Sequence, residues 1–210
     1  RLAEADAAIA ACRRRLTAAG GTLTGHRQTA AGKLAKAITR ELRDLGFTHG
    51  AFDVGLAHAP APRPSGLVVV DFGFAPNAGE PMRPLKAIAS SGEISRVMLA
   101  VKAVLAAHDR IPVLVFDEID ANVGGETGTA IGAKLMAVAA ARQVICITHL
   151  PQVAVQGASH YVVAKQVREG RTVTRIAPVN DDARVEEIAR MLGGRELTSV
   201  TLQHAREMLR

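Results

Sequence analysis

Two short apolar runs on either side of a helical stretch constrain this chain more than any other feature. Val113–Phe116 and residues 144–148 are almost uninterrupted apolar segments, and residues 128–141 between them have helical spacing. Continuous apolar runs of this length are typical of strands buried in a parallel sheet, where neighbouring strands need a crossover connection. The sequence therefore predicts a strand–helix–strand unit and an α/β fold with a partly parallel sheet.

The start of the chain has a different pattern. Residues 2–18 and 27–45 predict two helices, with Gly20-Gly21 as the break between them. In the first helix Leu2, Ile9 and Leu16 recur every seven residues, which is the spacing of a coiled-coil seam.

Positive charge is concentrated in the same region. Residues 1–46 carry nine Lys and Arg against four Asp and Glu, so they hold +5 of the net charge of +6. Arg13, Arg14 and Arg15 form the strongest basic cluster. Such an arm suits a nucleic-acid backbone, and it equally suits a solvated helix surface. We predict an arm with a connecting helix over residues 1–46 and a globular part over residues 47–210.

The rest of the chain alternates between strand and helix patterns. Residues 59–65 are rich in proline and predict a linker, and residues 76–84 predict a polar loop. A hairpin is expected around Glu169-Gly170, and Thr198 is a candidate N-cap. Strands are predicted at residues 52–56, 67–74, 161–165 and 172–178, and helices at 90–107, 183–192 and 199–209.

Composition excludes several classes of protein. No apolar run approaches the roughly 20 residues of a membrane span. The chain has only five Phe, one Tyr and no Trp, too few for base-stacking platforms on single-stranded nucleic acid. Cys12 and Cys146 are the only cysteines, so a disulfide framework or a cysteine zinc site is not expected. A reduced cytoplasm fits this composition, and a chain that begins with Arg1 suggests a piece of a longer protein.

Asp117 and Glu118 directly follow the apolar run Val113–Phe116. Ligands of α/β proteins bind at the carboxyl ends of strands, where these acids would emerge. This is the Walker B arrangement, in which the Asp holds the magnesium of a bound nucleotide and the Glu polarises an attacking water. A strand that ends in a solvated acidic turn gives the same pattern.

Two further segments are placed at predicted element edges. Ser90-Ser91-Gly92-Glu93 opens a helix as a capping box, and the same free N–H groups could bind an anion. His149 follows the second strand, where it could hydrogen-bond a phosphate oxygen or a water. Gly25, Gly32 and Lys33 imitate a phosphate loop, but six residues separate the glycines where the motif needs four. A two-metal nuclease cluster of Asp117, Glu118 and Asp120 is disfavoured, since no further acid or His clusters with them.

The combination resembles the RecN family, the bacterial SMC-like DNA repair ATPases of the ABC superfamily. The resemblance covers about residues 27–210. The segments that carry it are residues 84–96, residues 116–120 with Gly124-Gly125, residues 146–154 and residues 184–194. It implies the C-terminal half of an ATPase head, preceded by the end of a coiled-coil arm.

The resemblance also implies a mechanism and its participants. Asp117 would hold Mg²⁺ through water, Glu118 would be the general base, and His149 would sense the γ-phosphate. Residues Ser90, Ser91, Gly92 and Glu93 would contact ATP bound by a second head, and the loop at residues 120–124 would lie between the two heads. Partners would be the N-terminal half of the head with its Walker A, a second head in a homodimer, and double-stranded DNA ends or single-stranded overhangs. The protein would be bacterial, cytoplasmic and nucleoid-associated, with no membrane partner, and this chain alone would be inactive.

Departures from the family pattern leave alternatives open. The usual signature has glycine where this chain has Ser91, and the Walker A and Gln-loop are absent from these 210 residues. Asp117-Glu118-Ile119-Asp120 also matches the string of a DExD helicase lobe, although Ser90 and the strand end at Thr148-His149 argue against it. A non-enzymatic coiled-coil module that bridges DNA is the third interpretation.

Overall fold

The computed structural model describes residues 1–168, 170–194 and 196–210. Within these ranges the chain forms two compact units. The first unit comprises residues 1–43 and 47–89, and the second comprises residues 44–46 and 90–210. The sequence-based division after residue 46 concerns an arm and a head lobe of a larger protein, and it stays a prediction.

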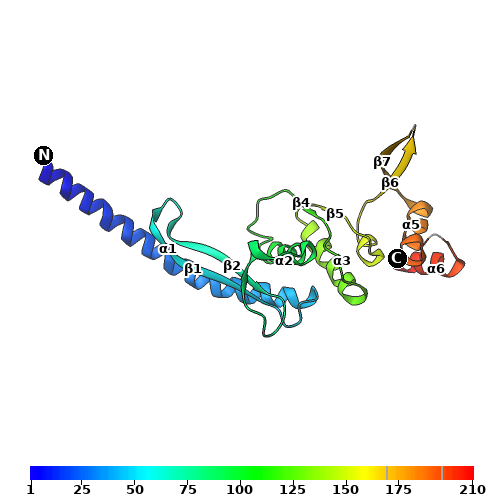
Figure 1. The fold of residues 1–210 in the computed structure, drawn as a ribbon, viewed down its shortest axis with the longest axis horizontal. Coiled ribbons are helices and arrows are strands. Elements are labelled where there is room, and N and C mark those ends of the chain that lie inside the picture. The colour runs from blue at the N-terminus through cyan, green and yellow to red at the C-terminus, as the bar shows by residue number, and fades with distance from the viewer. Residues whose placement is uncertain (169, 195) are drawn as a thin grey trace. The chain divides into compact units, whose positions relative to one another are not determined.

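One long helix dominates the first unit. Helix α1 (Leu2–Asp44) runs for 43 residues without interruption, so the predicted break at Gly20-Gly21 is wrong. Gly20 is buried, and a Cβ atom there would lie 2.4 Å from the Cγ atom of Leu67. Gly20 therefore allows a close approach to the hairpin beside the helix (Figure 1). Within a helix this glycine serves packing rather than termination.

That hairpin consists of β1 (Ala51–Arg63) and β2 (Gly66–Ala75), which pair antiparallel. The linker predicted at residues 59–65 is wrong for most of its length, because β1 continues to Arg63. Its prolines are tolerated because the register shifts between His58 and Arg63, which interrupts the regular ladder. Two short elements follow, β3 (Arg83–Pro84) and the 3₁₀ helix η1 (Leu85–Ala87).

The two ends of the first unit differ in packing. Near the base of α1, Phe47 and Phe74 meet edge to face with their ring centroids 5.0 Å apart. Along the rest of the helix, the apolar residues at seven-residue spacing are exposed, as expected for a coiled-coil seam whose partner helix is not part of the chain described here. These residues are Leu2, Ile9, Leu16 and also Leu23, which extends the predicted series by one heptad.

The second unit contains the predicted strand–helix–strand core. Strands β4 (Val113–Phe116) and β5 (Gln143–Cys146) pair parallel, and α3 (Gly125–Ala139) connects them. Helix α2 (Ser91–Val104) packs against α3. Leu114 and Phe116 are buried on one face of the strand pair. The prediction of full burial is wrong for the other face, where four apolar side chains are 42–63% exposed: Val113, Val115, Ile145 and Ile147.

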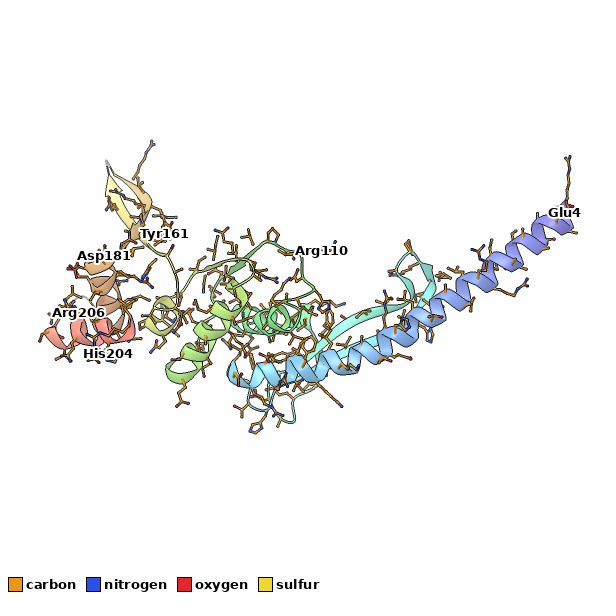
Figure 2. All side chains as sticks on the ribbon, turned by 180° about the vertical axis from the view of Figure 1, so that it is seen from behind. Glu4, Arg110, Tyr161, Asp181, His204 and Arg206 are labelled. Carbon is orange, nitrogen blue, oxygen red and sulfur yellow. The ribbon has the colours of Figure 1, made fainter. Side chains whose placement is uncertain are left out.

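The remainder of this unit is a hairpin and three helices. Strands β6 (His160–Arg168) and β7 (Arg171–Val179) pair antiparallel, as predicted, while Glu169 of the expected turn lies outside the described residues. Tyr161, labelled in Figure 2 at the start of β6, is 60% exposed. The short α4 (Pro151–Ala154) packs with α5 (Asp181–Gly193) and α6 (Ser199–Met208) around a small apolar cluster. Thr198 caps α6 as predicted.

None of the helices in the described ranges has the length and apolar character that crossing a membrane requires.

Candidate functional site

The two predicted acids emerge at the carboxyl end of β4. Asp117 and Glu118 directly follow Phe116, and both side chains are exposed. Glu118 has a φ angle of 54°, in the left-handed region that non-glycine residues rarely adopt. Backbone strain of this kind is concentrated at functional sites, where the surrounding structure holds it in place. The chain therefore presents a carboxylate at a sharply defined position after the strand.

The start of α2 carries the Ser90 half of the predicted capping box. Ser90 is the N-cap, with extended backbone, and its Oγ accepts a hydrogen bond of 3.3 Å from the N–H of Glu93. The hydroxyl of the next residue, Ser91, donates to a carboxylate oxygen of Glu118. The helix start and the acidic turn after β4 are thus in direct contact within one chain.

Gly92 is buried at this contact. A Cβ atom on Gly92 would lie 2.9 Å from the Cβ of Ala121 and 3.0 Å from the carbonyl oxygen of Glu118. The glycine is therefore required for the approach of α2 to the segment Glu118–Ala121. This steric reason lies within the chain itself and does not depend on a bound anion.

We expect Gly92→Ala to push α2 away from the acidic turn, because neither backbone oxygen nor Cβ can yield without moving the segment. Overpacking of this kind costs about 1–3 kcal/mol. The measurement is the thermal unfolding of the complete protein, and Gly25→Ala is the matched control because nothing lies within 4 Å of a Cβ there. Equal unfolding temperatures for Gly92→Ala and wild type would contradict the close contact.

Two more residues of α2 hold the same turn, and sequence reasoning missed both. Ser95 donates through Oγ to the carbonyl oxygen of Asp117 at 2.9 Å. Arg96 is 7% exposed, and its guanidinium donates to the carbonyl oxygens of Ile119 at 3.3 Å and Ala121 at 3.1 Å. Burial lowers the pKa of Arg96, and the charge of Glu93 opposes that shift. On the helical wheel Arg96 lies opposite the apolar stripe that includes Ile94 and Val101, so its position predicts exposure rather than burial.

Asp120 connects the turn after β4 to the end of β5. Its side chain is 1% exposed and accepts hydrogen bonds from the Thr148 hydroxyl and from the N–H groups of His149 (2.8 Å) and Leu150 (3.1 Å). Nδ1 of His149 lies 3.2 Å from the same carboxylate. Burial opposes ionisation of Asp120, but these hydrogen bonds and His149 outweigh it, so its pKa is lowered. Asp120 therefore fixes the backbone that presents His149.

Cys146, at the end of β5, is a half-buried free thiol. Burial, followed by the charges of Asp120 and Asp117, raises the pKa of its thiol to about 12. A thiol with a raised pKa stays protonated at neutral pH and is a weak nucleophile.

The structure thus brings most of the predicted site residues into one region of the second unit. Ser91 and Gly92 contact the turn that carries Asp117 and Glu118, and Asp120 links that turn to His149. Ser90 and Glu93 complete the helix cap beside them. The arrangement offers exposed carboxylates, a histidine and a helix N-terminus, which together suit a phosphate-bearing ligand with a cation.

Comparison with known proteins gives consistent relatives, although no protein-family model matches the chain. The chain is 39% identical over 199 residues to the DNA repair protein RecN of Bacillus subtilis, covering 88% of this chain and 34% of that protein. It is 42% identical over 190 residues to RecN of Deinococcus radiodurans, covering 90% of this chain and 33% of that protein. It is 47% identical over 147 residues to RecN of Treponema pallidum, covering 70% of this chain and 26% of that protein. The chain spans about a third of the length of the first two of these relatives.

Solved structures support the fold. The Smc head domain with a coiled coil and joint from Pyrococcus yayanosii matches 78% of this chain with a TM-score of 0.55 and 19% identity, over 29% of that structure's chain. The Smc head domain with an extended coiled coil from Pyrococcus furiosus matches 80% of this chain with a TM-score of 0.51 and 18% identity, over 38% of its chain. The predicted fold class, part of an SMC-type head preceded by a coiled-coil helix, is confirmed.

Proposed function

This chain is a relative of the RecN DNA repair proteins that spans about a third of their length, and we propose that it forms the C-terminal half of an ATPase head. The observation that carries this proposal is the contact between α2 and the acidic turn after β4. It holds the Walker B acids Asp117 and Glu118 against the signature segment that begins at Ser90.

The open face of β4 and β5 supports the presence of a second half. Parallel strands are normally covered on both faces, but Val115 and Ile147 are 63% and 55% exposed here. A two-stranded parallel sheet with one bare apolar face needs further elements against it. In the proposed head, the N-terminal half of the same protein covers this face and contributes the Walker A loop.

The residues of this chain fit ATP and Mg²⁺. Magnesium prefers a few carboxylate oxygens together with water, and Asp117 is an exposed carboxylate at the strand end. When bound, the cation would neutralise charge on the phosphates. Asp117 would hold it through water, and His149, fixed by Asp120, would donate a hydrogen bond to the γ-phosphate or to the attacking water.

Glu118 would accept a proton from the attacking water as the general base. Its carboxylate already accepts one hydrogen bond, from Ser91. Ser91 is the residue that replaces a glycine of the family pattern. Ser91 therefore links the base of one site to the signature segment Ser90–Glu93, which would contact ATP held by a second head. The proposed active form is a pair of identical heads with ATP between them.

The wider role follows from the relatives. Because these relatives are DNA repair proteins of bacteria, we place the complete protein at the nucleoid in the cytoplasm. Engagement of its heads would be coupled to the binding or bridging of double-stranded DNA ends or single-stranded overhangs.

The first test compares the chain with the complete protein. We expect these 210 residues, expressed alone, to bind no fluorescent ATP analogue, because they lack a loop that cradles the α- and β-phosphates. The complete protein should bind the analogue and hydrolyse ATP. Tight binding by the isolated chain, or no hydrolysis by the complete protein, would contradict the proposed division of the head.

A further inference from the structure

The base of α1 carries a row of positive charge that the proposed ATPase site does not use. Lys33, Lys36, Arg40 and Arg43 are spaced by three, four and three residues, and all four side chains are exposed. At about 100° per residue, this spacing keeps them within an arc of roughly 80° on one side of the helix. Ile38 and Leu42, which are fully buried, lie on the opposite side.

This basic row borders a groove within the first unit. The groove has a volume of about 370 Å³ and is lined by Ala35, Lys36, Thr39, Arg40, Arg43 and Phe52. Its wall is fixed, because the N–H of Phe52 donates a 3.0 Å hydrogen bond to Oγ1 of Thr39. The start of β1 is thereby attached to α1 beside the cations.

Little negative charge opposes the row. Arg40 lies 3.9 Å from a carboxylate oxygen of its neighbour Glu41. Asp44, at the end of the helix, is 3.0 Å from the ammonium of Lys134, which takes up its charge. In the part of the chain that the structure describes, Lys33, Lys36 and Arg43 carry no acidic partner.

We propose that this groove, the α1 phosphate groove, binds the sugar–phosphate backbone of double-stranded DNA. The proposal rests on the proposed function, which supplies DNA as the partner, and adds the surface that contacts it. From Lys33 to Arg43 the helix rises about 15 Å. Over that length of helix axis, one strand of a duplex carries about four phosphates.

The chemistry of the groove favours backbone contacts over base recognition. Phe52 is its only aromatic residue and is 5% exposed, so it offers no face on which a base could stack. Lysine and arginine contacts to phosphates position a protein on DNA without reading its sequence. The groove therefore binds duplex DNA with little dependence on sequence.

The spread of side chains around the helix also makes this groove a better DNA contact than the basic cluster at Arg13, Arg14 and Arg15. Arg13, Arg14 and Arg15 are consecutive in α1, so their side chains spread over about 200° around the helix. They cannot all face one duplex, whereas the four residues of the basic row can.

The test measures DNA binding by the complete protein, without nucleotide, over a range of salt concentrations. Each phosphate contact contributes about 0.9 to the slope of log affinity against log salt. We expect the quadruple variant Lys33→Gln, Lys36→Gln, Arg40→Gln and Arg43→Gln to lower the slope by about 3.6 and weaken binding at least tenfold. Lys36→Gln alone should lower it by about 0.9. Replacing Lys33 and Lys36 with arginine should leave the slope unchanged.

Two further variants serve as controls for the salt dependence of DNA binding. A quadruple variant of exposed arginines in the second unit, Arg171, Arg175, Arg206 and Arg210 to Gln, should keep the wild-type slope. The triple variant Arg13→Gln, Arg14→Gln and Arg15→Gln should lower it less than the groove variant does. An unchanged slope in both Lys36→Gln and the groove variant would overturn the proposal. Because nucleotide is absent, this result is independent of whether wild-type protein hydrolyses ATP, which tests the proposed function.

Discussion

Replacing Glu118 with glutamine is expected to abolish ATP turnover by the complete protein while ATP binding persists. Glutamine keeps the shape of the side chain and can still accept the hydrogen bond from Ser91. It cannot accept a proton from the attacking water, and loss of a general base lowers turnover by about 10²–10⁴-fold. Steady-state phosphate release and equilibrium binding of an ATP analogue measure the two effects separately.

Glu186→Gln is the matched control, because Glu186 is an exposed glutamate on α5, remote in sequence from the turn after β4. It should retain wild-type turnover and binding. If Glu118→Gln turned over ATP at the wild-type rate, Glu118 would not be the base and the acidic turn would be structural. If instead ATP binding were lost, the residue would belong to nucleotide recognition.

Removing the carboxylate of Asp120 is expected to give the largest loss of stability. Asp120→Ala leaves the Thr148 hydroxyl and the N–H groups of His149 and Leu150 without their acceptor. Unsatisfied donors of this kind cost about 1–3 kcal/mol each when buried, so a total of about 3 kcal/mol is expected for this partly buried set. Thermal unfolding of the complete protein should shift down by several degrees, and turnover should fall because His149 is no longer held.

Asp182→Ala serves as the control, since Asp182 is an exposed aspartate in the first turn of α5. Its unfolding temperature should stay close to that of wild type. A loss of turnover without any loss of stability in Asp120→Ala would assign the carboxylate to the reaction rather than to the support of His149.

The acid dependence of stability gives a second check on Asp120. Its pKa is lowered in the folded protein below the ordinary value of an aspartate, 3.8. A carboxylate with a lowered folded pKa stabilises the fold above its unfolded pKa, and this contribution is lost as pH falls through the folded value. The stability difference between wild type and Asp120→Asn should therefore be constant above about pH 5 and shrink as pH falls below about 4. A difference independent of pH would contradict the ionised state of Asp120.

Much of the fold could be predicted because local signals agreed with the tertiary structure. The apolar run of β4 and the cap at Ser90 each specify one element, and neither needs a distant partner to be recognised. Gly20 shows where this reasoning fails. A glycine at a helix break and a glycine under a packed leucine look the same in a sequence, since the difference lies in Leu67, 47 residues away.

The sequence predicted which residues form the candidate site, but not the hydrogen bonds that hold them together. Asp117, Glu118 and His149 could be found because they follow apolar strands directly. The loop at residues 120–124 begins with Asp120, whose side chain is buried against Thr148–Leu150. In a sequence, an acid two residues after an exposed acid carries no sign of burial. The supporting contacts of Ser95 and Arg96 depend in the same way on which carbonyl oxygens the turn presents.

The uninterrupted course of α1 has a mechanical consequence. A helix of 43 residues is a stiff rod about 65 Å long. Gly20 packs against Leu67 at the point where the sequence predicts a break between two helices. A lever of this length magnifies small movements, so a tilt of about 10° at its base displaces its tip by roughly 11 Å. Small rearrangements beside the base of α1 can therefore be transmitted along the rod as large displacements.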